Sequence, residues 1–150
     1  MTDMPTTPRL ALPLLAVSQA QKEVTHNEAL TLLDALLHAA VEAGPLAAPP
    51  ASPVTGQCWL VDAVPTGAWA GNSHAIAIWT AGGWRFAPPR EGVTVVRLTD
   101  NMRLRFDGAA WVPPATVGMP TGGAIIDSEA RSAISTLILS LAAQGLLISG

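Results

Sequence analysis

Proline and glycine interrupt this chain so often that they limit what it can fold into. The 150 residues include 13 of each, with dense groups at residues 44–53 and 113–123. Because both residue types break regular structure, only two segments can form helices of several turns. No apolar run approaches the roughly 20 residues of a bilayer-spanning helix. We therefore expect a soluble protein without a membrane partner.

The composition predicts one compact domain with appendages. A chain of this length with 49% apolar residues can bury about two-thirds of its unfolded surface. The formal charge is -3 and Lys22 is the only lysine, so we expect no nucleic-acid partner, because such a site requires a dense cationic surface. Residues 1–20 lack a basic region followed by an unbroken apolar core, which argues against a secretory signal and for synthesis in the cytoplasm.

Few residues could carry chemistry. Cys58 is the only cysteine, which excludes an internal disulfide and favours a small buried hydrophobe in a strand. Asp34, His38 and Glu42 share one helix face and could present three metal ligands, although the spacing also fits a solvated face with weak acid–imidazole pairs. The sequence contains no nucleophile elbow, phosphate-binding loop or dinucleotide motif. We expect a protein that is not an enzyme and holds no metal or cofactor.

The N-terminal part predicts an arm followed by a helix. Residues 1–25 begin with a proline-rich stretch that has no helical period, which favours an extended arm lying on a partner. A helix should follow at about residues 26–43, because Thr25 and Glu28 fit a capping box and leucines recur at spacings of three and four. Gly44 and the proline after it supply the stop.

The central part predicts an antiparallel β-meander. Residues 57–112 contain short β-prone runs separated by turns rich in glycine, proline or aspartate. The dipeptides at 82–83 and 107–108 are hairpin signals. Along residues 102–106 arginines alternate with apolar residues, so one face should be buried and the other wet. Together with the preceding helix, we expect one α+β domain over residues 26–112, with a small barrel or sandwich.

The C-terminal part predicts a tether and an oligomerisation helix. Residues 113–125 hold too many prolines and glycines to sustain a strand ladder or a helix. Asp127 or Ser128 then caps a helix that runs to about Gln144, within a C-terminal segment of residues 126–150. This helix could fold onto its own chain, but the tether favours a bundle of identical subunits, a trimer or a pentamer. The expected seam residues are Ala130, Ile134, Leu137, Ile138 and Leu141.

The five tryptophans divide into two groups. Trp59, Trp79, Trp84 and Trp111 lie in expected strands, where large rings usually fill the core. Trp69 lies in a loop with glycine on both sides, and it either stacks on a sugar ring or plugs the end of the barrel. An exposed Trp69 would support an alternative function, a carbohydrate-binding module.

Several short blocks carry a resemblance to a known family. They are residues 19–30 (QAQKEVTHNEAL), 67–71 (GAWAG), 76–79 (IAIW) and 89–92 (PREG). Over residues 8–112 the chain resembles an uncharacterised domain found in phage-derived tail-fibre proteins and in the head-spike proteins of gene transfer agents, the phage-like particles that move host DNA between bacteria. The resemblance implies a virion structural protein, a head-spike base or adaptor that links the capsid to a receptor-binding fibre. The alternative is a carbohydrate-binding tail-fibre or spike module that contacts host surface polysaccharide through Trp69.

The resemblance also implies partners and docking residues. The expected partners are further copies of this chain, capsid or other virion proteins, and a spike or tail-fibre protein. The polar residues that would dock to the particle stand just before and within the first helix. They are Gln19, Gln21, Lys22, His26 and Asn27. The alternative is that the amide side chains of the glutamines and of Asn27 satisfy main-chain groups near the helix start.

Overall fold

The computed structural model describes residues 4–16, 22–123 and 127–150. The protein has a mixed α+β fold, and the chain forms two compact units, Met1–Pro89 (unit 1) and Arg90–Gly150 (unit 2). The boundary lies inside the expected single domain of residues 26–112. The consecutive prolines 88 and 89 explain the position of this boundary, because neither offers a main-chain donor that could continue a strand ladder.

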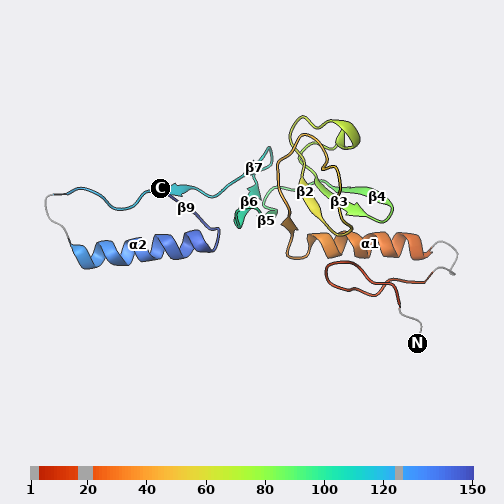
Figure 1. Ribbon diagram of the computed structural model, residues 1–150, viewed down its shortest axis with the longest axis horizontal. Helices are drawn as coiled ribbons and strands as arrows, with labels where there is room; N and C mark the ends of the chain where they lie inside the picture. Colours follow the sequence, from red (N-terminus) through yellow and green to blue (C-terminus); the bar gives the residue numbers. More distant parts are fainter. Residues whose placement is uncertain (1–3, 17–21, 124–126) are drawn as a thin grey trace. The chain divides into compact units, whose positions relative to one another are not determined.

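Unit 1 contains one long helix, α1, which spans Lys22–Leu36 (Figure 1). Our expected helix of residues 26–43 is wrong at both ends, because Thr25 lies inside α1 and does not cap it. The chain leaves the helix before His38, whose positive φ of 49° ends the regular backbone. Val41, expected on the helix, is fully buried in the short strand β1, Ala40–Val41.

The sheet of unit 1 has three antiparallel strands in the order β2-β3-β4. They span Cys58–Leu60, Ile76–Thr80 and Gly83–Ala87. Residues 81–82 connect β3 to β4, and Gly83 adopts a φ of 94°, which confirms the predicted hairpin. Cys58 is buried as expected, and burial raises the pKa of its thiol to about 11.

A cluster of four tryptophans combines one residue from each strand of this sheet with Trp69. The ring of Trp84 meets Trp59, Trp69 and Trp79 edge to face, with centroid separations of 5.6, 5.2 and 4.9 Å. Trp69 ends a short 3-10 turn, Gly67–Trp69, and is 0% exposed. The expectation of an exposed, sugar-stacking Trp69 is therefore wrong, because the turn directs the indole into the core. The indole ring instead fills the interior of unit 1, as in the other option considered for Trp69.

Unit 2 begins with the antiparallel strands β5 (Thr94–Arg97), β6 (Met102–Phe106) and β7 (Trp111–Val112), which pair in that order. Within β6 the arginines are exposed while Leu104 and Phe106 are buried, which confirms the predicted alternation. The carboxylate of Asp107 accepts from two main-chain amides of the following turn and shapes the predicted second hairpin. The sheets are open and do not form the closed barrel that we considered.

The expected tether at residues 113–125 contains a strand, so the prediction that it sustains no ladder is wrong. Strand β8, Thr116–Val117, pairs in parallel with β9, Ile148–Ser149, beyond the C-terminal helix. The prolines of this segment flank the paired residues and leave their main-chain donors intact. The guanidinium of Arg131 donates to the carbonyls of Pro120 and Gly122, so the segment lies beside the helix (Figure 1).

The C-terminal helix α2 spans Ser128–Ala143, close to the predicted bounds. Asp127 caps it by accepting from the main-chain amide of Ala130 at 2.9 Å. Gly145 follows with a φ of 66°, and its carbonyl accepts from the amide of Arg103 on β6. The side chain of Asn101 also donates to the carbonyl of Ala143. The end of α2 is thus attached to the β5–β6 turn.

Candidate functional site

Residues 4–16 fold into a loop, here called the N-terminal clasp, that lies on α1 of its own chain. The loop closes through a bridge between Thr6 and Pro13. The carboxylate of Asp34 on α1 accepts from the hydroxyl of Thr7 at 2.7 Å and from the amides of Arg9 and Leu10 at 3.0 and 2.7 Å. The described part of the expected extended arm is therefore bound within unit 1.

The side chain of Arg9 caps the C-terminal end of α1. Its guanidinium donates to the main-chain carbonyls of Asp34, Ala35 and His38 at 2.6, 2.8 and 3.2 Å. The carbonyls of Asp34 and Ala35 belong to the last turn of α1, where helix carbonyls generally lack partners within the helix, and a cation there also complements the helix dipole. Sequence reasoning missed this contact. The available signal was a single acid, Asp34, inside a run of apolar helix residues.

The five expected docking residues have different surroundings. Gln19 and Gln21 lie outside the described residues, and Lys22 begins α1. His26 is exposed on α1. Asn27 is half-buried, and its amide side chain bonds the main-chain amide and carbonyl of Leu15 at 2.9 and 3.0 Å. For Asn27 this is the alternative that we considered, an amide that satisfies main-chain groups.

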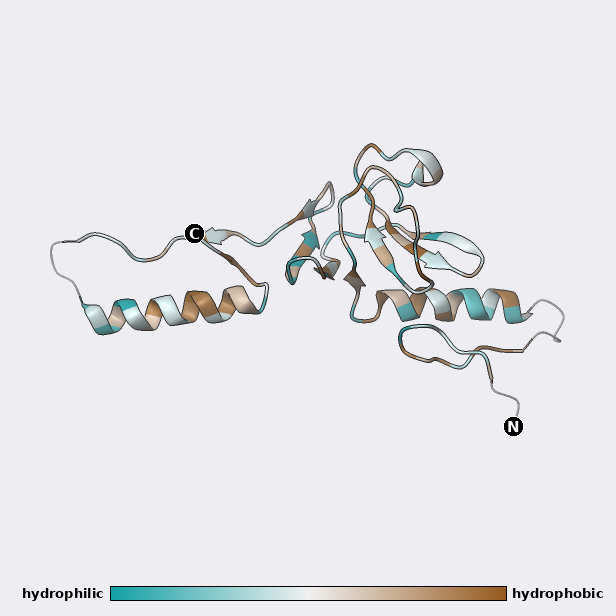
Figure 2. Cartoon of the chain, in the orientation of Figure 1, coloured by the Kyte–Doolittle hydropathy of each residue, from teal (hydrophilic) through white to brown (hydrophobic). Residues whose placement is uncertain are grey.

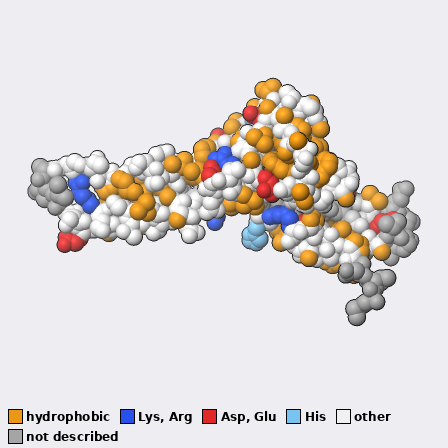
Figure 3. Space-filling view, in the orientation of Figure 1, with side chains coloured by type: hydrophobic (Ala, Val, Ile, Leu, Met, Phe, Trp, Pro, Cys, Tyr) orange, Lys and Arg blue, Asp and Glu red, His pale blue; other side chains and the backbone are white. Residues whose placement is uncertain are grey.

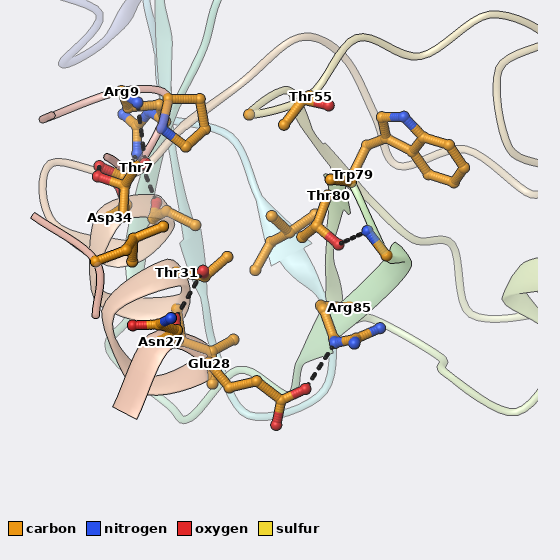
Figure 4. Close-up of a pocket in the computed structure, with 18 of the residues that line it drawn as sticks. Thr7, Arg9, Asn27, Glu28, Thr31, Asp34, Thr55, Trp79, Thr80 and Arg85 are labelled. Atoms are coloured by element: carbon orange, nitrogen blue, oxygen red, sulfur yellow. Dashed lines mark hydrogen bonds and ion pairs between the residues drawn. The ribbon is translucent and has the colours of Figure 1, made fainter. Parts of the chain in front are cut away.

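A cavity of about 440 Å³ lies between the clasp, α1 and the β3–β4 hairpin (Figure 4). Its apolar wall includes Leu14, Leu32 and Ile78. At one rim the carboxylate of Glu28 on α1 pairs with the guanidinium of Arg85 on β4, at 3.2 Å between Oε1 and Nε. This cavity, lined by the clasp, α1, residues 55–56 and the β3–β4 hairpin, did not follow from any sequence pattern.

The three residues that the sequence offered as possible metal ligands do not share a solvated helix face. Asp34 is 2% exposed and already accepts three hydrogen bonds, His38 follows the end of α1, and Glu42 lies beyond β1. Among the described residues no group of three or more histidine, cysteine, aspartate or glutamate side chains is placed to hold a metal ion.

Helix α2 presents an apolar face that the described part of the chain does not cover. Ile134 is 46% exposed and Leu137 is 59% exposed, and Ala130 lies on the same side one turn earlier. Figures 2 and 3 show hydrophobic residues along this helix and on its visible face. Three of the five expected seam residues are thus available to a partner.

The other two expected seam residues are less accessible. Ile138 is 6% exposed, so its assignment to an intersubunit seam is wrong for the chain as folded here. It shares a helix side with Arg131, Ser135 and Ala142, the less exposed side of α2, which is covered by other segments of unit 2. Leu141 is half-buried. The accessible stripe is consequently narrower than the sequence pattern indicated.

The described helices are too short or too polar to cross a membrane. A comparison with curated proteins found no match. Residues 26–112 match a family described as a protein of unknown function, DUF2793. The match covers His26 and Asn27 on α1, the tryptophan cluster and the strands through β7. Because it spans more than half of the 150 residues, the chain belongs to the DUF2793 family.

Proposed function

We propose that this protein is a structural component of a phage-like particle of the gene transfer agent type. In this role it is a head-spike base or adaptor that links the capsid to a receptor-binding fibre, and it performs no catalysis. The resemblance of residues 8–112 to domains of such particles supports the proposal. The observation that carries it is the exposed stripe of Ala130, Ile134 and Leu137 on α2.

Burial of this stripe between copies of the chain would stabilise an assembly. A fully buried leucine or isoleucine side chain contributes about 1.5 to 3 kcal/mol before ordering costs are subtracted. Rotational symmetry repeats each contact, so modest individual contributions hold several subunits together. A symmetric bundle of α2 helices would give a fibre a base with several equivalent attachment points.

The proposal is tested by charging the stripe in the full-length chain. Ile134→Asp combined with Leu137→Asp should convert an oligomer into a monomer, as measured by light scattering. Leu139→Asp is the matched control, because Leu139 is 54% exposed but lies on the opposite side of α2. It should leave the mass unchanged. The double variant should also be absent from purified particles. A wild-type chain that is monomeric and missing from particles would refute the proposal.

A further inference from the structure

The cavity of unit 1 has walls that are held apart at their rims. Arg9 and Asp34 fix the clasp to α1. Glu28 and Arg85 join α1 to β4 across the rim (Figure 4). On the third side the clasp lies directly against Gly56, where a Cβ atom would come within 2.8 Å of Pro8. These contacts keep open a space that protein interiors normally fill with side chains.

The charged groups around the cavity already have partners within unit 1. The carboxylate of Asp34 accepts three hydrogen bonds, the guanidinium of Arg9 donates to three carbonyls, and Glu28 pairs with Arg85. The hydroxyls of Thr31 and Thr80 donate to main-chain carbonyls at 2.8 and 2.7 Å. A charged ligand would therefore lose its hydration without gaining an unpaired counter-charge.

The size and lining of the cavity match a small-molecule site. Its volume of about 440 Å³ lies within the roughly 300 to 1,000 Å³ that is typical of such sites, which are lined mainly by apolar groups. The neighbouring edge of β4 is less suited to an added peptide strand. Arg85 Nη1 donates to the carbonyl of Trp84 at 3.2 Å, which occupies a main-chain acceptor that an incoming strand would need.

We propose that this cavity binds a small, uncharged and largely apolar molecule. The ligand enters between the clasp and the β3–β4 hairpin, and its apolar body replaces water against Leu14, Leu32 and Ile78. The driving force is the burial of apolar surface in a preformed site. This binding site is separate from the exposed stripe of α2, so the two proposals stand or fall independently.

Nile red, a neutral apolar dye whose emission rises in apolar surroundings, is the probe. We expect saturable binding of one dye per chain to the full-length protein. Thr31→Phe places a ring in the cavity and should weaken binding by at least about tenfold. Thr136→Phe is the matched control, because the Thr136 hydroxyl makes the same bond to the carbonyl four residues earlier, but on α2. It should change the affinity by less than about twofold.

A second measurement keeps the proposal falsifiable if Thr31→Phe fails to fold. In the wild-type protein, nuclear Overhauser contacts should connect the dye with the methyl groups of Thr31, Thr55 and Ile78, which line the cavity. Absence of saturable binding would overturn the proposal. Binding that survives in a folded Thr31→Phe variant, or dye contacts with α2 only, would overturn it equally.

Discussion

Replacing Asp34 with alanine should lower the free energy of unfolding of this protein by about 3 to 4 kcal/mol. The carboxylate is 2% exposed and accepts three hydrogen bonds from the clasp. A hydrogen bond to a charged group contributes about 1.5 to 3 kcal/mol. A simple sum would therefore reach about 4.5 to 9 kcal/mol, but the three bonds do not count equally.

The burial of the three donors reduces this sum. The hydroxyl of Thr7 belongs to a residue that is only 2% exposed, so the variant leaves it without an acceptor in a dry site. The amides of Arg9 and Leu10 are partly accessible, and water replaces much of what they lose. The clasp can also detach as a unit, which limits the loss to the free energy that binds it to α1.

Urea unfolding followed by tryptophan fluorescence measures the change. Hydrogen exchange adds a local readout, because the amide of Leu10 should lose its protection in Asp34→Ala. Asp62→Ala is the control, since the Asp62 carboxylate belongs to a half-buried residue and accepts from the adjacent amide of Ala63. It should cost less than about 1 kcal/mol. If Asp34→Ala matches this control and Leu10 remains protected, the assigned role of Asp34 is wrong.

Two further predictions concern backbone geometry and pH. In urea unfolding, Gly145→Ala should lower the free energy of unfolding by about 2 kcal/mol more than Gly122→Ala. Both glycines have a similar positive φ, but only at Gly145 would an added Cβ overlap the carbonyl oxygen of Asn101. Equal losses in the two variants would contradict this prediction. Burial raises the pKa of Cys58 from 9.0 to about 11, so the folded state holds the thiol proton more tightly than the unfolded state. That contribution is complete below pH 9.0 and is lost as the pH rises through about 11, so the stability of wild type relative to Cys58→Ala should fall by about 2 to 3 kcal/mol across this window. A difference independent of pH would argue against a buried thiol.

Local patterns predicted much of the secondary structure. The hairpins at 82–83 and 107–108 form as expected, because short-range turn chemistry is strong enough to act without distant contacts. The cap at Asp127 and the glycine at 145 bound α2 for the same reason. The alternation along β6 also appears in the structure, since a strand with one buried face fixes which side each residue takes.

The first helix shows where local patterns were insufficient. The capping box at Thr25 is a legitimate start signal, yet its residues are equally compatible with a helix interior. The end of α1 depends on Arg9, which is about 25 residues away in the sequence and covers the last carbonyls. No spacing rule within the helix could reveal a partner that arrives from another segment.

Trp69 and the segment of residues 113–123 illustrate the same limit. Glycine neighbours made Trp69 look exposed, but the ring is buried and meets Trp84 of strand β4. Proline and glycine made the segment look like a tether, but Thr116 pairs with Ile148 from the far end of the chain. In both cases a long-range contact outweighs the local preference.

The sequence by itself therefore determined the class of structure, the turns and the apolar stripe of α2, because these depend on neighbours within a few residues. The tertiary structure decided which polar groups are buried, where α1 ends and which seam residues remain accessible. It alone brought the clasp, α1 and the β3–β4 hairpin together around a cavity. The physical reason is that burial and hydrogen-bond partners are properties of segments distant in sequence, and only folding brings those segments into contact.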